Sequence, residues 1–201
     1  MKEIEKIFKK AKEEGRNFLL EPEGYFILEK LKINVPKYIF LKLKEELKKD
    51  DLEKIKSEKI VLKIVSSKIL HKSDVGGVLF LEKDYDEIIK NISVFEKKFK
   101  EKDGFLICEM VEYKKEFGTE ILIGTKLSND FGPILTIGFG GILTEFYAKN
   151  FKSVSIFSPL VEDENLILKS LKDSVLGKKL WGKMRGEEIL VDESIFLNYM
   201  D

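Results

Sequence analysis

The stretch that organises this chain is Val61-Leu62-Lys63-Ile64-Val65-Ser66-Ser67-Lys68-Ile69-Leu70-His71-Lys72-Ser73-Asp74-Val75-Gly76-Gly77-Val78, which places the only histidine between an apolar run and a pair of glycines. Residues 60–65 are apolar and rich in β-branched side chains apart from Lys63, which predicts a strand buried on both faces of a sheet. A buried ammonium group needs an anionic partner or gives up its charge. We therefore expect Lys63 either to leave the core at the strand end or to meet an anion.

The residues that follow this strand favour the handling of phosphate. A neutral imidazole such as that of His71 can accept a phosphoryl group at nitrogen. Lys72 and the backbone N–H groups of Gly76 and Gly77 are suited to stabilise the added negative charge, and Asp74 is suited to orient the ring. The residues thus indicate a phosphoryl-transfer site. The alternatives are a hydrogen-bonded structural histidine and a lysine at the strand end that reaches solvent.

The overall composition narrows the class of protein. The 201 residues suffice for one domain or two small lobes with a real core. The 36 basic and 36 acidic residues balance, so there is no electrostatic footprint for nucleic acid. Cys108 has no second cysteine to pair with and lies in an apolar run, which predicts a buried thiol in a reducing compartment. No apolar run approaches the roughly 20 residues that span a bilayer, and the charged N-terminus is no signal peptide. We therefore expect a cytoplasmic protein without a membrane partner.

Apolar spacing predicts the elements of the first half. Residues 2–14 have helical spacing and are followed by Gly15, so we assign residues 1–19 to an N-terminal docking helix. Glu21-Pro22-Glu23 has the proline and the acidic residues of a helix start. The lysine- and glutamate-rich run that ends at Lys56 is typical of a solvent-facing helix, and residues 85–99 are typical of a long amphipathic one.

The character of the sequence changes at Gly104, after which strand candidates follow one another. Ser128-Asn129-Asp130 predicts a hairpin turn between two of them. A further strand is expected near 142–146, and helices over 163–174 and from Asp192 onward. The fold class is therefore α/β (α+β) with two small lobes, residues 20–103 and 104–201.

Two features of the second lobe bear on nucleotide binding. Glu109-Met110-Val111 follows an apolar strand, where a main-chain hinge can meet an adenine edge. Gly138-Phe139-Gly140-Gly141, followed by Glu145, lets the backbone approach a ligand, although tight turns need glycine equally. Neither a dinucleotide-binding fingerprint nor a Walker A sequence is present. A nucleotide site would therefore combine a lysine of one lobe with a strand-edge hinge of the other.

The stretch from Val61 to Val78 resembles the signature of the ATP-grasp subunit of ADP-forming acyl-CoA synthetases. The resemblance is collinear over nearly the whole chain. It also includes Leu20-Glu21-Pro22-Glu23-Gly24, Ile33-Asn34-Val35-Pro36, Glu109-Met110-Val111, Glu120-Ile121-Leu122-Ile123-Gly124, Phe131-Gly132-Pro133 and Gly138-Phe139-Gly140-Gly141 with Glu145.

This resemblance implies an ATP-grasp fold with ATP or ADP between two lobes. In the family, a CoA-binding alpha subunit forms an acyl phosphate from acyl-CoA and phosphate, and the phosphoryl group reaches ADP through a phosphohistidine. His71 matches the carrier histidine, Lys63 the lysine that holds the nucleotide phosphates, residues 109–111 the adenine hinge, and Glu120 an acid of the nucleotide site. The implied protein is one subunit of a hetero-oligomeric acetate–CoA ligase, with CoA on its partner.

The sequence departs from the family pattern at two places. No arginine lies between Phe151 and Leu160, where the family usually has one shortly before its Ala-Pro-Leu. The acidic-Ile-Asn-Pro strand and the later aspartate that hold Mg²⁺ in the family are also absent, so the metal ligands are unassigned and a shortened second lobe is expected. An alternative is therefore a non-catalytic or incomplete ATP-grasp subunit that binds nucleotide or partner without turnover. Another is a related protein-lysine acetyltransferase with its acyltransferase domain elsewhere.

Overall fold

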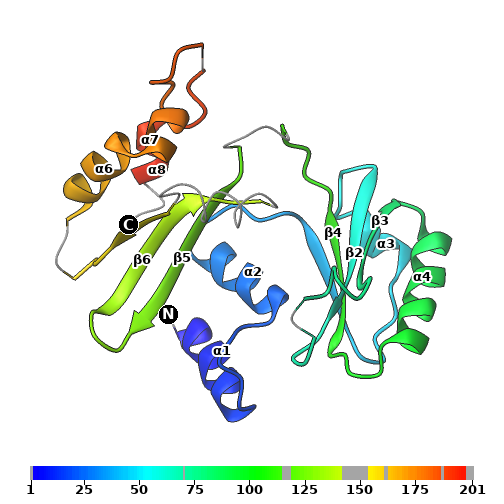
Figure 1. The fold of residues 1–201 in the computed structure, drawn as a ribbon. Helices are drawn as coiled ribbons and strands as arrows, with labels where there is room; N and C mark the ends of the chain where they lie inside the picture. The colour runs from blue at the N-terminus through cyan, green and yellow to red at the C-terminus, as the bar shows by residue number, and fades with distance from the viewer. Residues whose placement is uncertain are drawn as a thin grey trace. The chain divides into compact units, whose positions relative to one another are not determined.

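The computed structural model describes residues 2–69, 71–114, 119–141, 154–160, 163–186 and 188–197. The chain folds as two compact units, Met1–Glu112 and Tyr113–Asp201, which we call the N-terminal and C-terminal units. Each unit contains an antiparallel sheet with helices packed against it (Figure 1). The expected α/β (α+β) class is confirmed. Among the described residues, no helix combines the length and the apolar character that crossing a membrane requires.

The N-terminal unit is built around a four-stranded sheet with the strand order β1-β4-β2-β3. Its strands are β1 (Tyr38–Lys42), β2 (Lys59–Val65), β3 (Val78–Glu82) and β4 (Gly104–Glu109). β2 has a neighbour on each side, and Lys63 lies opposite Val78 of β3 and Leu106 of β4. The strand that carries Lys63 is therefore central in the sheet.

The boundary between the units falls after Glu112, which corrects the expected boundary at residues 103/104. β4 pairs with β1 and with β2, so it joins β1 to the rest of the first sheet. The change in character at Gly104 is real, but it marks the return of the chain to this sheet. Glu109 and the three residues after it, up to Glu112, thus belong to the N-terminal unit.

The two faces of β2 pack against different helices. Ile60, Leu62 and Ile64 are fully buried in the main core, which also contains Ile88 and Phe95 of α4 (Tyr85–Lys98). The opposite face, which carries Val61, Lys63 and Val65, packs under α2 (Glu21–Lys30) through Leu20 and Tyr25. Burial of β2 on both faces is thus confirmed, and the second face places Lys63 near the start of α2.

The first helix, α1 (Lys2–Glu13), is tied to the start of α2 by a buried arginine. The Arg16 side chain is 5% exposed and donates to both carboxylate oxygens of Glu23 at 2.9 Å, and also to Glu14. Such paired guanidinium–carboxylate hydrogen bonds fix orientation as well as distance. The helix expected over residues 2–14 is confirmed, and its docking role stays a prediction.

The segment between β1 and β2 differs from the expected solvent-facing helix. It contains only α3 (Lys49–Leu52), a single helical turn. Leu47, Leu52 and Ile55 are all buried in the main core. A mostly irregular segment thus buries these three side chains, and the expected helix is realised only as one turn.

The C-terminal unit is built around a three-stranded sheet with the strand order β5-β6-β7. Its strands are β5 (Ile121–Ser128), β6 (Gly132–Phe139) and β7 (Val154–Phe157), and its helices are α6 (Glu164–Asp173), α7 (Val175–Leu180) and α8 (Glu193–Leu197). The predicted hairpin through residues 128–130 is confirmed, since β5 pairs with β6. Phe196 of α8 is buried against Trp181. The strand expected at 142–146, with Glu145, lies outside the described residues.

Gly104 offers a test of this sheet. A Cβ at this position would lie 2.3 Å from the backbone oxygen of Leu41 and 2.8 Å from the Phe40 ring. Backbone atoms of a paired strand cannot move aside easily, so we expect Gly104→Ala to lower the free energy of unfolding by about 2 kcal/mol. Urea denaturation measures this change. The matched control is Gly24→Ala in α2, where no atom lies within 4 Å of the new Cβ and no loss is expected. Equal stability of the two variants would contradict the register of β1 against β4.

Candidate functional site

The charge of Lys63 is met by a glutamate at the start of α2. Pro22 lies in the first turn of this helix, as the sequence predicts. Proline is favourable there because its missing N–H would have no partner within the helix. α2 packs on the face of the sheet that carries Lys63, and this brings Glu21 to the lysine. Lys63 Nζ donates to Glu21 Oε1 at 2.5 Å, and the two side chains are 22% and 23% exposed. Of the two alternatives for Lys63, the anion is thus the correct one.

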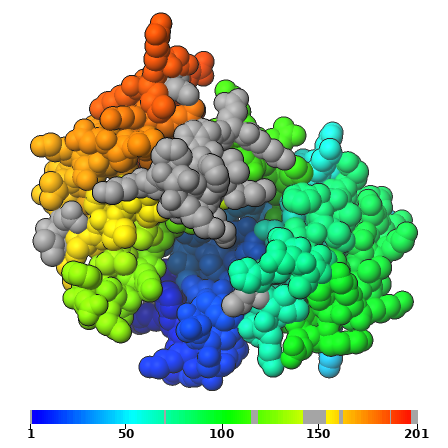
Figure 2. Space-filling model, in the orientation of Figure 1, coloured from blue at the N-terminus to red at the C-terminus, as the bar shows by residue number. Residues whose placement is uncertain are grey.

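Glu21 also holds the segment that carries His71. Its second oxygen, Oε2, accepts a hydrogen bond from Lys72 Nζ at 2.9 Å, and the Lys72 side chain is only 17% exposed. Tyr25 OH donates to Oε1 at 3.2 Å. One carboxylate therefore joins β2 to the segment after it. Figure 2 shows this segment, in blue-green, beside the blue surface of α2.

The protonation state of Glu21 follows from these contacts. Burial alone would raise the pKa of its carboxyl group, but the hydrogen bonds from Lys63 and Lys72 outweigh burial and hold the pKa below its ordinary value. Glu21 is therefore ionised at neutral pH. Two ammonium groups against one carboxylate leave the cluster with a positive charge, which suits an anionic ligand.

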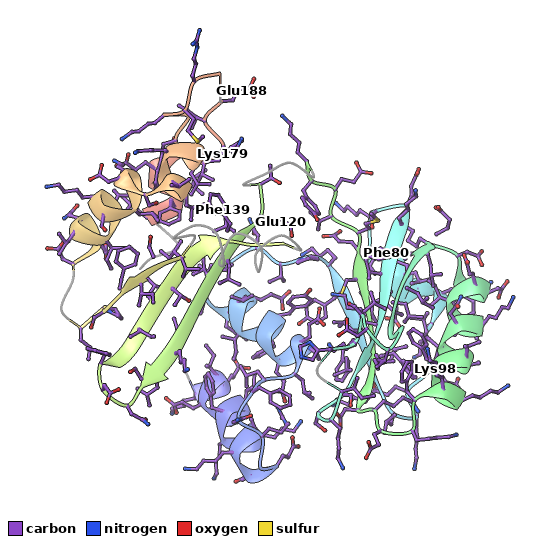
Figure 3. The ribbon with its side chains drawn as sticks, in the orientation of Figure 1. Phe80, Lys98, Glu120, Phe139, Lys179 and Glu188 are labelled. Atoms are coloured by element: carbon purple, nitrogen blue, oxygen red, sulfur yellow. The ribbon has the colours of Figure 1, made fainter. Side chains whose placement is uncertain are left out.

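A cleft of about 580 Å³ opens beside this cluster. It brings together most of the residues that the sequence predicts for phosphoryl transfer. Its lining consists of Glu21, Val61, Lys63, His71, Lys72, Ser73, Asp74, Val78 and Phe80. His71 is exposed, and among the described residues no hydrogen bond joins it to Asp74. The orienting role of Asp74 stays a prediction. Phe80, labelled in Figure 3, is 69% exposed and adds an aromatic ring to the apolar part of the lining.

The segment that carries His71 is fastened where it leaves β2. Ser66 is 3% exposed, and its Oγ accepts hydrogen bonds from the backbone N–H groups of Lys68 and Ile69 while donating to Glu101 O. The backbone N–H of Ser67 donates to Asp103 Oδ2 at 2.5 Å. These contacts fix the direction in which the segment starts.

The glycine pair closes the segment where it enters β3. Gly76 has a φ of +68°, and its N–H donates to Ser73 O, while the N–H of Gly77 donates to Lys72 O at 2.7 Å. A Cβ on Gly77 would lie 2.8 Å from the Ile64 side chain. Both N–H groups are therefore used within the turn, and the role of Gly76 and Gly77 as phosphate ligands stays a prediction. Lys98, at the end of α4 in Figure 3, donates to Val75 O at 2.8 Å and supports the same turn.

The predicted adenine hinge, residues 109–111, follows β4. The N–H of Glu109 donates to Lys37 O, and its carboxylate accepts from Lys37 N at 2.8 Å. The N–H of Met110 donates to Lys59 O at 3.0 Å. Glu109 and Met110 thus fasten the strand ends, while Val111 is 54% exposed. Contact of this hinge with adenine stays a prediction.

Glu120 lies in the C-terminal unit against the second glycine pair. The N–H of Gly140 donates to Glu120 O at 2.8 Å, and a Cβ on Gly141 would lie 2.6 Å from Glu120 Oε1. Tyr113 OH donates to the same oxygen at 3.2 Å. Figure 3 shows Glu120 next to Phe139. The two glycines therefore leave room for this carboxylate, and its contact with nucleotide stays a prediction.

The described part of the chain does not hold a protein-only metal site. It contains no group of three or more histidine, cysteine, aspartate or glutamate side chains placed to bind an ion. Cys108 is free and 2% exposed, as predicted, and burial raises the pKa of its thiol to about 11. The thiol is therefore neither an ion ligand nor a nucleophile here.

Glu21 is the site residue that the sequence does not reveal. Its position before Pro22 predicts an acidic residue at the start of a helix, and this is correct. The prediction does not include its contacts with Lys63 and Lys72. The sequence contains one indication of Glu21, which is the charge of Lys63 within an apolar strand. That charge points to an anionic partner but does not show which residue supplies it. The partner lies 42 positions away in the sequence.

Comparison with known proteins identifies the family. A family profile described as an ATP-grasp domain matches residues 10–190. The beta subunit of ADP-forming acetate–CoA ligase I from Pyrococcus furiosus is 33% identical over 164 residues, covering 80% of this chain and 67% of that protein. The chain belongs to the ATP-grasp family of ADP-forming acyl-CoA ligases.

Other members of the family are larger. The ADP-forming 4-hydroxybutyrate–CoA ligase of Nitrosopumilus maritimus is 35% identical over 196 residues, which are 91% of this chain and 25% of that protein. The chain thus spans about a quarter of the length of that ligase.

Solved structures share the ATP-grasp fold. The dinucleotide-forming acetyl-coenzyme A synthetase 1 of Ca. Korarchaeum cryptofilum, in complex with coenzyme A and Mg-AMPPCP, matches with a TM-score of 0.71 and 28% identity. The match covers 97% of this chain and 81% of that one. In that complex, the phosphohistidine segment points towards the nucleotide binding site.

Proposed function

We propose that this chain is the nucleotide-binding, phosphohistidine-carrying subunit of an ADP-forming acyl-CoA ligase. The observation that carries the proposal is the cleft that His71 shares with Lys63 and Lys72. A nucleophilic imidazole beside two ammonium groups is the arrangement that phosphoryl transfer needs, because the cations offset the charge of the moving phosphoryl group. The phosphohistidine segment of the Korarchaeum synthetase supports the same role for residues 66–77.

The chemistry assigned to His71 balances without a further reactant. A ring nitrogen of the neutral imidazole uses its lone pair to form a bond to the γ-phosphorus of ATP. The bond between that phosphorus and the bridging oxygen breaks, and the oxygen leaves with the electron pair as part of ADP. The second ring nitrogen keeps its proton. In the reverse direction, the phosphoryl group returns from His71 to ADP.

The residues around His71 have separate tasks in this proposal. Lys63 is fixed in the central strand and holds a nucleotide phosphate, while Lys72 travels with His71 and accompanies the phosphoryl group. No step is assigned to Mg²⁺, because the described residues do not form a metal site. A CoA-binding alpha subunit would supply the acyl phosphate, in keeping with the Pyrococcus relative, which is a beta subunit.

The experiment incubates the full chain with Mg²⁺ and ATP radiolabelled at its γ-phosphate. We expect protein-bound label that is stable in alkali and lost in acid, as a phosphorus–nitrogen bond requires, and that returns to added ADP. The second candidate function is nucleotide or partner binding without turnover, which the missing cluster of metal ligands in the described residues favours. Binding of ADP without any label would select this second function.

A further inference from the structure

A shared anion, Glu21, joins Lys72 of the His71 segment to Lys63 of β2, while the glycine turn at the far end of the segment is held separately by Ile64 N–H, which donates to Gly77 O at 2.9 Å. Glu21 accepts from Lys63 at 2.5 Å and from Lys72 at 2.9 Å, with all three side chains less than a quarter exposed. Lys98 supports the same turn through the backbone oxygen of Val75. A contact at Glu21 therefore links the lysine proposed for nucleotide phosphate to the segment proposed to carry the phosphoryl group.

We propose that Glu21 is a positioning residue that occupies Lys63 and Lys72 in place of phosphate and releases the His71 segment when a phosphate group binds. The proposal rests on the proposed function of Lys63 and His71. Phosphoryl transfer through His71 does not by itself require a carboxylate that competes with the ligand, so this competition goes beyond the proposed function. Glu21 forms no bond to the moving phosphoryl group.

Two anions, the Glu21 carboxylate and a bound phosphate, compete for the same two ammonium groups. Carboxylate and phosphate oxygens both accept charge-assisted hydrogen bonds from ammonium groups. A phosphate that reaches Lys63 is repelled by the ionised Glu21, and this repulsion is strong in a partly buried cleft. Coupling between two binding events is reciprocal. Phosphate at Lys63 therefore weakens the hold of Glu21 on both lysines, and Lys72 is freed together with His71.

Hydrogen exchange of the full chain without nucleotide tests the hold itself. The amides of Gly76 and Gly77 are the reporters, because their N–H groups donate within the turn that begins at Lys72. We expect Glu21→Gln to speed their exchange about tenfold, since loss of the charge weakens both ion pairs. Lys72→Met removes the other half of the contact and should speed exchange to a similar degree. Pyrophosphate, a probe without a base, should speed exchange in the wild type and add little in Glu21→Gln.

Nucleotide affinity tests the competition. We expect Glu21→Gln to bind ADP about tenfold more tightly than the wild type, because the repelling charge is gone. The matched control is Glu23→Gln, in the same helical turn. Glu23 binds Arg16 and does not line the cleft, so this variant should lose stability but leave ADP affinity and the exchange of Gly76 and Gly77 unchanged.

The outcomes separate the inference from the function on which it rests. Unchanged exchange in both Glu21→Gln and Lys72→Met overturns the role of Glu21 in holding the His71 segment, whatever the effect on nucleotide binding. Weaker ADP binding in Glu21→Gln overturns the competition and makes Glu21 a support for Lys63. Faster exchange together with no ADP binding by any form keeps the hold at Glu21 but refutes the proposed nucleotide binding. Pyrophosphate that leaves the exchange of the wild type unchanged refutes release by phosphate.

Discussion

His71→Asn is expected to take up no phosphoryl group from ATP, with labelling at least about a thousandfold below that of the wild type. Asparagine keeps a polar side chain of similar reach, but its amide nitrogen has no available lone pair for attack on phosphorus. His71 is exposed, so the fold has little to lose. We therefore expect ADP affinity and the unfolding midpoint to stay close to those of the wild type. Acid-labile label on the chain and calorimetric titration with ADP measure the two properties.

The single histidine makes this result decisive. Label that persists in His71→Asn cannot be phosphohistidine and would assign the acceptor to another residue type. Ser73→Ala, an exposed neighbour in the same cleft, is the matched control and should label like the wild type. Loss of label in both variants would indicate that any change in the segment prevents transfer, and it would weaken the assignment of His71 as acceptor.

The sequence predicts the elements of the site better than their assembly. The apolar run around Lys63 indicates a buried strand, which is confirmed, and it requires the lysine either to reach solvent or to meet an anion; the structure has the anion. The identity of the anion depends on how α2 lies across the sheet. This packing is set by contacts such as those of Leu20 and Tyr25 with the buried cluster of Val65, Leu106 and Cys108, which have no local periodicity in the sequence.

Long-range pairing also explains the lobe boundary. The strand composition that begins at Gly104 is correctly recognised, but local pattern does not say which sheet a strand joins. β4 inserts between β1 and β2, whose positions in the sequence lie far upstream. The glycine pair shows the same limit, since the pattern offers the N–H groups of Gly76 and Gly77 to phosphate but does not reveal that both also donate within their own turn.

Lys63→Met is expected to weaken ADP binding about a hundredfold. Methionine preserves much of the apolar stem in the strand, so the change removes mainly the ammonium group. A charge-assisted hydrogen bond to phosphate in a partly buried cleft contributes about 1.5–3 kcal/mol. In addition, Glu21 then has Lys72 but no longer Lys63 to offset its negative charge. Calorimetric titration with ADP measures the loss. Lys63→Arg keeps the charge and should recover part of the affinity.

The matched control for this loss is Lys59→Met on the same strand. Lys59 is 61% exposed and lies 3.9 Å from Glu82, a surface pair that contributes little. Its replacement should leave ADP affinity within about twofold of the wild type. If Lys59→Met and Lys63→Met weaken ADP binding equally, Lys63 acts only through the overall positive charge of the protein and not as a specific phosphate ligand.

Combining Lys63→Met with Glu21→Gln separates a direct phosphate ligand from an indirect one. If Glu21 lowers ADP affinity by competing for Lys63, then Glu21→Gln should strengthen binding in the wild type and much less in Lys63→Met. The two changes are in contact, so their effects should be non-additive. Additive effects would instead mean that Glu21 repels the nucleotide from a distance and that Lys63 binds it independently. The double-mutant cycle thus measures whether one lysine serves both anions.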